Sequence, residues 1–159
     1  MKVFHGSTSA IEKPEVRFSK RYLDFGKGFY VTTYKQQAER WAKRKALRQN
    51  KKAIVSIYDL QEDFSGFEKL EFLDDNEAWI DFVCACRNGE KIYERYDIVI
   101  GSVANDDVFR TVNMYFQGLW SKERVLKELR YYQLNDQLCL INQMLIDENL
   151  KYIESYEVV

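Results

Sequence analysis

The chain has 159 residues, of which 46% are hydrophobic and 31% are charged, and this composition excludes a disordered or collagen-like chain. Its length corresponds to one domain, residues 1–159, and its net charge of −1 does not favour binding to nucleic acid. No apolar run reaches the roughly 20 residues of a membrane-spanning helix, and no apolar signal-peptide core follows Met1. We therefore expect a cytoplasmic protein with no membrane partner.

The N-terminal half is predicted to contain, in chain order, a strand at 2–4, an irregular segment at 8–27, a strand at 29–32, a helix at 34–49, and strands at 53–58 and 69–72. The strand at 29–32 is a β-branched and aromatic run that follows Gly26 and Gly28. Tyr34 and Ala38 belong to the apolar repeat that predicts the helix, and Thr33 is its expected N-cap.

The C-terminal half is predicted to contain a helix from Asp74 or Asp75 to about 87, a strand at 96–103, a helix from Asn105 to about 117, a helix at 121–132 capped by Ser121, and strands at 138–141 and 152–158 that flank a short helix. Gly89 is expected to end the first of these helices. Helices and strands do not alternate regularly, which favours a mixed α+β fold over a doubly wound parallel sheet.

The cysteines Cys84, Cys86 and Cys139 do not form a disulfide framework, and one histidine in the chain is too few for a zinc site. We expect all three to be small buried residues in a reducing compartment.

The positive charge is concentrated in the N-terminal third. Residues 1–52 contain 14 Lys and Arg against 4 Asp and Glu, whereas residues 53–159 contain 10 against 21. This asymmetry indicates either that the N-terminal third faces an anion such as phosphate or that a solvated basic helix pairs with the acidic remainder. Both interpretations stay open.

Three short segments are candidates for chemistry. His5 follows a predicted strand and precedes Gly6, which permits close approach of a ligand to the backbone. The segment 25–30 places two glycines before Tyr30, and Tyr30 and Trp41 on neighbouring elements can either sandwich a flat ring or pack in the core. The polar residues that precede the strand at 138–141 either position hydrogen bonds or form a turn.

Taken together, these segments resemble motifs of the ADP-ribosyltransferases in the diphtheria-toxin and poly(ADP-ribose)-polymerase branch. His5-Gly6-Ser7 resembles the first motif, and Phe-Gly-Lys-Gly-Phe-Tyr-Val at 25–31 is similar to the second. In the polymerases a second stacking aromatic follows the first by eleven residues, as Trp41 follows Tyr30. Gln137 falls where that branch usually has its catalytic glutamate.

The whole chain also resembles a family of small bacterial ADP-ribosyltransferase-like proteins, through recurrent blocks at 24–30, 96–101 and 153–158. The resemblance implies an α+β fold in which split β-sheets, flanked by helices, form a cleft for NAD. The catalytic residues that it implies are Gln137, Tyr30 and His5, and the NAD-binding residues are His5, Gly6, Ser7, Arg21, Gly28, Tyr30 and Trp41. NAD would serve as the substrate, without a metal.

The resemblance also implies a role for each residue. His5 would hydrogen-bond the adenine-side ribose, and Gly6 would clamp the nicotinamide amide with its backbone N–H and C=O. Tyr30 would stack on the nicotinamide ring with Trp41 on its other side. Arg21 and its basic neighbours would offset the charge of the pyrophosphate.

The activity that follows from the resemblance is transfer of one ADP-ribose from NAD to a macromolecular acceptor, a protein or a nucleic acid. A toxin or defence effector with an antitoxin partner is the expected setting. Because Gln137 is neutral, it can orient the ribose 2′-hydroxyl but cannot supply the negative charge of the family's glutamate. We therefore expect Gln137→Glu to release nicotinamide at the same rate as the wild type or faster.

Two alternatives stay open. One is a catalytically inactive module that binds NAD or ADP-ribose without turnover, which the glutamine at position 137 favours. The other is a nucleic-acid-binding protein that uses the basic helix at 35–52, for which a steep dependence of binding on salt is the test.

Overall fold

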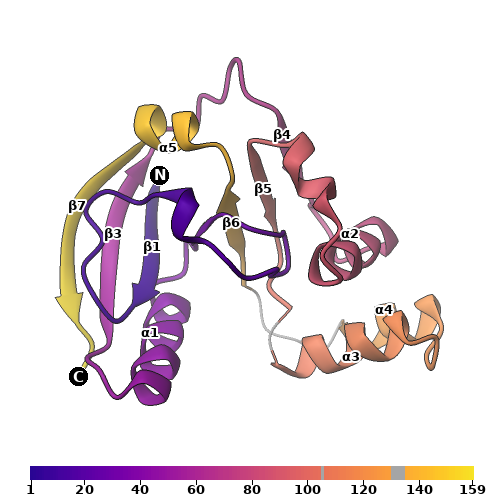
Figure 1. Ribbon diagram of the computed structural model, residues 1–159. Helices are drawn as coiled ribbons and strands as arrows, with labels where there is room; N and C mark the ends of the chain where they lie inside the picture. Colours follow the sequence, from indigo (N-terminus) through magenta and orange to yellow (C-terminus); the bar gives the residue numbers. More distant parts are fainter. Residues whose placement is uncertain (105, 130–134) are drawn as a thin grey trace.

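The computed structural model describes residues 1–104, 106–129 and 135–159 (Figure 1). Its elements are β1 (Lys2–Ser7), β2 (Phe29–Val31), α1 (Lys35–Gln49), β3 (Ile54–Leu60), β4 (Lys69–Glu71), α2 (Glu77–Arg87), β5 (Ile98–Gly101), α3 (Asp106–Phe116), α4 (Lys122–Leu129), β6 (Gln137–Leu140), α5 (Gln143–Asn149) and β7 (Leu150–Glu157), with short 3₁₀ helices at Val16–Phe18 and Lys91–Arg95. This architecture confirms the predicted α+β class.

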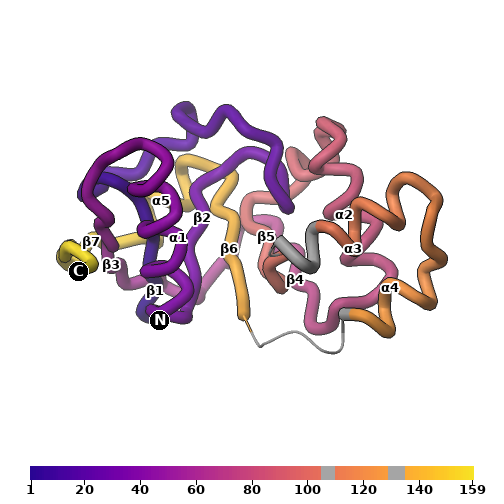
Figure 2. The backbone as a smooth tube through the Cα atoms, turned by 90° about the horizontal axis from the view of Figure 1, so that it is seen from below, coloured from indigo at the N-terminus to yellow at the C-terminus, as the bar shows by residue number. Residues whose placement is uncertain are grey.

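The strands form two sheets. The three-stranded sheet has the order β1-β3-β7 and is antiparallel, and the four-stranded sheet has the order β2-β6-β5-β4, in which only β4 and β5 are parallel. Figure 2 shows β1, β3 and β7 at one end of the molecule, α2, α3 and α4 at the other, and β2 and β6 between them. The isolated bridge Phe4↔Thr32 links β1 to the chain just after β2.

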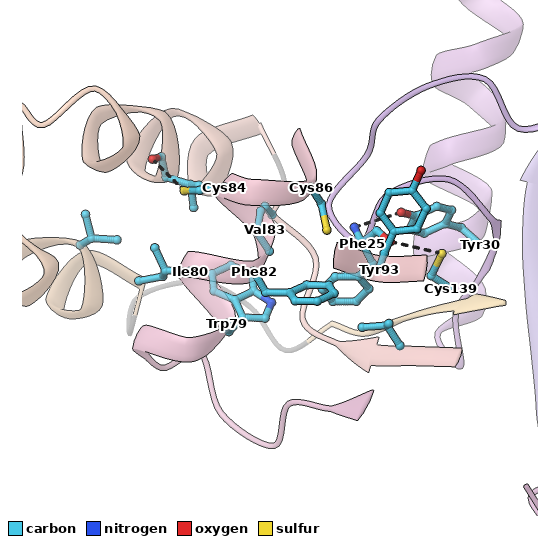
Figure 3. Close-up of a cluster of buried hydrophobic side chains, with 14 residues drawn as sticks. Phe25, Tyr30, Trp79, Ile80, Phe82, Val83, Cys84, Cys86, Tyr93 and Cys139 are labelled. Atoms are coloured by element: carbon cyan, nitrogen blue, oxygen red, sulfur yellow. Dashed lines mark hydrogen bonds between the residues drawn. The ribbon is translucent and has the colours of Figure 1, made fainter. Parts of the chain in front are cut away.

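Alternation of side chains along the strands divides the interior into three cores. One face of the three-stranded sheet packs against Ala38, Ala42 and Ala46 of α1. A second core lies between the two sheets, where Val3 and Leu60 meet Leu138 and other residues of the four-stranded sheet. The third core lies between the four-stranded sheet and α2, and Figure 3 shows its aromatic and sulfur-containing side chains.

Several boundaries differ from the predictions for local reasons. The first strand continues through His5-Gly6-Ser7 because those residues pair with β3. Thr33 does not cap α1, since its N–H and hydroxyl are bound by the carboxylate of Asp136, far away in sequence. The second helix begins at Glu77 instead of Asp74 or Asp75, because the Asn76 side chain accepts a hydrogen bond from the backbone N–H of Trp79, 3.1 Å away.

Other predictions are confirmed. Gly89 follows α2 with a φ of 86°, and Ser121 caps α4 by accepting a hydrogen bond from the N–H of Arg124. All three cysteines are buried and free. Asn105, the predicted start of the third helix, and residue 132, the predicted end of the fourth, lie outside the described residues. Within the described part of the chain, no helix is long and apolar enough to cross a membrane.

Candidate functional site

The two sheets separate next to His5. Phe4 and Thr32 exchange two backbone hydrogen bonds of 2.8 and 2.9 Å, and this bridge is isolated. In an antiparallel ladder, the N–H and C=O groups of every second residue point to the same side. The backbone N–H and C=O of Phe4 point toward Thr32, and those of Thr32 point toward Phe4. Two residues further along each strand, the backbone groups of Gly6 and Tyr30 therefore point into the same gap between β1 and β2. The split therefore leaves the N–H groups of Gly6 and Tyr30 facing this gap, outside both ladders.

Two side chains form hydrogen bonds with the carbonyl oxygens at the gap. The imidazole Nδ1 of His5 lies 2.6 Å from the carbonyl oxygen of Tyr30, and Nζ of Lys45 donates to the carbonyl oxygen of Gly6 at 2.9 Å. Lys45 reaches the gap from α1, whereas the His5 ring stacks on Phe29 with centroids 4.3 Å apart. The gap is thus supported from both faces of the three-stranded sheet.

The His5 ring is held in one protonation state. Burial, and then the positive charge of Lys45, lower the pKa of His5 from 6.5 to about 3, so the ring is neutral at physiological pH. A carbonyl oxygen can only accept, and Nδ1 of His5 therefore carries the proton that is donated to Tyr30. The other nitrogen, Nε2, is left as a hydrogen-bond acceptor, which suits a ligand hydroxyl.

A cleft of about 520 Å³ opens beside the split. Figure 1 shows the segment that follows β1 crossing in front of the sheets before the chain enters β2. The cleft is lined by His5, Ala10, Ile11, Glu12, Lys13, Pro14, Glu15, Phe18, Ser19, Leu23, Gly28, Phe29, Tyr30 and Lys45. The crossing segment is held by the N–H of Ile11, which donates to Ser56 Oγ, and by the N–H of Val16, which donates to the Gln143 side chain. It forms one wall of the cleft.

The cleft lining contains two lysines, Lys13 and Lys45, and two glutamates, Glu12 and Glu15, and Lys45 is the lysine next to the split. Burial lowers the pKa of Lys45, and the neighbouring cations Arg48 and Arg21 lower it further. The other basic residues of the helix at 35–52 are exposed to solvent. Lys45, with Arg21 and Arg48 near it, therefore provides a site where a phosphate group would be stabilised.

Gly28 and Gly6 are both required for close packing. A Cβ at Gly28 would lie 2.5 Å from Sγ of Cys139, so the glycine lets the edge of the cleft approach β6. A Cβ at Gly6 would lie 2.1 Å from the carbonyl oxygen of Ala38, and 3.0 Å from Cβ of Trp41. Trp41, on α1, therefore lies next to Gly6, on β1, and its side chain is partly buried. Ser7 is the last residue of β1 and pairs with β3.

Tyr30 contributes its backbone to the gap and its ring to the core. The side chain is 8% exposed and packs between the four-stranded sheet and α2 (Figure 3). Its hydroxyl donates to the carbonyl of Gly26 at 2.6 Å and accepts from the N–H of Phe25 at 3.0 Å. Burial raises its pKa well above the ordinary value. This placement disfavours the predicted stacking of the Tyr30 ring on nicotinamide.

Gln137 lies in a closed polar network instead of the cleft. Its side chain is 3% exposed, and its amide donates to Oδ2 of Asp24 at 2.9 Å and to the carbonyl of Ser102 at 3.1 Å. Asp24 also forms an ion pair with Arg87 and accepts from the N–H of Ala104 at 2.8 Å. The amide nitrogen of Gln137 thus already has two acceptors within the protein.

The side chains of His5 and Gln137 are on opposite faces of the four-stranded sheet. Gln137 and Cys139 share the face that packs toward α2, because Leu138 between them points into the inter-sheet core. His5 stacks on Phe29, which belongs to that inter-sheet core. The structure therefore brings His5, Gly28 and the Tyr30 backbone together, with Gly6 adjoining them, but does not bring Gln137 to them.

Sequence reasoning missed Lys45 and Asp24. Lys45 was one of many basic residues on its helix, and only its position next to Gly6 distinguishes it. Asp24 precedes the motif at 25–31, and an acidic residue before an apolar and glycine-rich segment was the available signal. Within the described ranges, no group of three or more His, Cys, Asp or Glu side chains is placed to hold a metal ion.

Comparison with known proteins gives one family. The model of DUF3990, described as a protein of unknown function, matches residues 1–152. No curated protein matches the chain significantly. Because the family model covers nearly all of the sequence, the chain belongs to the DUF3990 family.

Proposed function

We propose that the cleft beside β1 and β2 binds NAD or its ADP-ribose portion, and that the protein is an ADP-ribosyltransferase-like domain. The observation that carries the proposal is the split after Phe4↔Thr32, which leaves the backbone groups of Gly6 and Tyr30 facing one gap. The motif resemblance predicts a ligand amide at Gly6 and a ribose at His5. Both residues adjoin the same gap, from opposite faces of β1.

The chemistry of the cleft supports a dinucleotide. Neutral His5 has an acceptor nitrogen for a ribose hydroxyl, and the N–H and C=O of Gly6 match the acceptor and donor of a carboxamide. Lys45 and Arg21 supply positive charge for a pyrophosphate. Under this proposal these groups would contact a ribose, the carboxamide and the pyrophosphate of NAD.

Binding is tested by calorimetric titration of NAD and ADP-ribose into the wild type, His5→Phe and Ser9→Ala. The phenylalanine keeps a ring against Phe29 and removes both nitrogens, so we expect binding to weaken about tenfold, the loss of about one good hydrogen bond. Exposed Ser9 is the control and should bind as the wild type does. Failure of the folded wild type to bind either ligand at millimolar concentration would refute the proposal.

Transfer of ADP-ribose to a macromolecule is the second candidate, and the position of Trp41 beside the Gly6 backbone favours it. A Cβ at Gly6 would lie 3.0 Å from the Cβ of Trp41, and under this proposal the indole ring would face the leaving nicotinamide. Mass spectrometry of NAD incubated with the protein and a bacterial lysate tests it. Free nicotinamide and a macromolecular adduct would establish transfer, whereas binding without either product would establish a module that does not turn NAD over. The buried amide of Gln137 favours the latter outcome.

A further inference from the structure

Lys45 differs from the other basic residues of α1 because it is partly buried and lines the cleft. Its ammonium group lies 2.9 Å from the carbonyl oxygen of Gly6, at the edge of β1 that faces the split. This is the same carbonyl that, under the proposed function, would accept a hydrogen bond from the nicotinamide amide. A ligand amide at Gly6 must therefore lie within a few ångströms of a fixed cation.

No ion pair neutralises this cation in the described part of the chain. The ion pairs found there join other residues, and none includes Lys45. Arg48 and Arg21 both lower the pKa of Lys45, so the charges that act on Lys45 are also positive. Lys45 in turn lowers the pKa of His5, so its field extends across the gap.

We propose that Lys45 makes the cleft select against a positively charged ring at Gly6, so that ADP-ribose and NADH bind more tightly than NAD⁺. This inference rests on the proposed function, because it assumes that a dinucleotide occupies the cleft. The oxidised nicotinamide ring carries one positive charge, whereas the reduced ring has the same amide and no charge. ADP-ribose has a hydroxyl in place of the ring.

The expected size of the preference follows from the repulsion of two like charges a few ångströms apart at the effective dielectric constant of a protein surface. It corresponds to about tenfold or more in affinity. All three ligands share the adenosine and the pyrophosphate, so any attraction between Lys45 and phosphate cancels in the comparison. The preferred ligand class is therefore a dinucleotide or ADP-ribose without a cationic ring.

The test is a titration of ADP-ribose, NADH and NAD⁺ into the wild type, Lys45→Met, Lys45→Arg and Lys43→Met. Methionine retains much of the length of the lysine stem without its charge, and arginine keeps the charge. Lys43 lies on the same helix, is exposed, and is the matched control. We expect the wild type, Lys45→Arg and Lys43→Met to bind NADH about tenfold more tightly than NAD⁺, and Lys45→Met to bind the two alike through tighter binding of NAD⁺.

Equal affinity of the wild type for NADH and NAD⁺ would overturn the inference while leaving the proposed function standing. So would a Lys45→Met protein that binds all three ligands more weakly by the same factor, because Lys45 would then act on the shared phosphates. If Lys45→Met does not fold, as judged by thermal unfolding, the wild-type comparison of NADH with NAD⁺ still decides. Failure of all three ligands to bind the wild type would refute the proposed function, and this inference with it.

Discussion

The protein contains two polar regions on opposite faces of β2, and they differ in how fully the protein itself satisfies their hydrogen bonds. Around Asp24, each carboxylate oxygen has a partner, and the amide of Gln137 donates to two acceptors. Around the split of β1 and β2, the N–H of Gly6 lies outside both ladders, and His5, whose Nε2 is left as an acceptor, lines the cleft. A buried polar group whose hydrogen bonds are all made within the protein stabilises the fold. A polar group next to a cleft with a hydrogen bond still to make is available to a ligand.

Removing Asp24 should cause the largest loss of stability, because Arg87 would lose its ion pair with this buried carboxylate, and the Ala104 N–H and the Gln137 amide would lose an acceptor. We expect Asp24→Ala to lower the free energy of unfolding by about 3–5 kcal/mol. Urea denaturation at pH 7 measures the change. Glu62→Ala, at an exposed position, should change it by no more than about 0.5 kcal/mol. A stable Asp24→Ala protein would show that the network around Asp24 contributes little to the fold.

Gln137 separates the two regions most directly. Gln137→Leu leaves the carbonyl of Ser102 and one oxygen of Asp24 with fewer partners, and we expect a loss of about 1–3 kcal/mol in stability. Affinity for ADP-ribose should stay within about twofold, because the side chain is on the far face from His5. A folded Gln137→Leu protein with its stability intact and its ligand binding lost would place Gln137 in the site after all.

Gln137→Glu, which the resemblance predicts to release nicotinamide as fast as the wild type or faster, should also affect stability through this network. The new carboxylate would take the position of an amide that lies 2.9 Å from Asp24 Oδ2, and two carboxylates at that distance repel each other. We expect Gln137→Glu to be less stable than the wild type at pH 7 and to recover part of that loss at lower pH, where one of the pair binds a proton. Urea midpoints at pH 7 and pH 5, referenced to the wild type, provide the measurement.

His5 makes the smallest predicted contribution, and it depends on pH. Its pKa is about 3 in the folded protein and 6.5 in an unfolded chain, so below pH 6.5 the unfolded state binds a proton that the folded state does not. Stability should fall by about 1 kcal/mol between pH 6.5 and pH 5.5. His5 is the only histidine, and His5→Gln should remove most of this slope. An unchanged slope in His5→Gln would mean that His5 titrates normally in the folded state.

The secondary structure was largely accessible from the sequence, because apolar repeats and turn residues act locally. The repeat through Ala38 predicted α1, and Gly89 marked the end of α2. The errors arose where a distant residue intervened. The carboxylate of Asp136 accepts a hydrogen bond from the backbone N–H of Thr33, and no sequence pattern near Thr33 predicts a partner about a hundred positions later.

The candidate site was accessible only in part, for a related reason. The motif segments identified which residues come together at the gap, but not which face each side chain takes. Tyr30 and Gln137 both turn toward α2, because the helices α2–α4 cover that face of the four-stranded sheet. Lys45 turns toward the split because α1 packs directly on Gly6, where no side chain separates the helix from the strand. These choices depend on packing between elements that are far apart in sequence.

The strand order also has a consequence for synthesis of the chain. In both sheets, strands from the first sixty residues pair with strands that follow residue 136: β2 lies beside β6, and β3 lies between β1 and β7. While the ribosome is still making the middle of the chain, the apolar faces of β2 and β3 lack these neighbours. Long-range pairing of this kind slows folding and prolongs the exposure of apolar surface to solvent. Folding of both sheets must therefore wait until the C-terminal strands emerge from the ribosome.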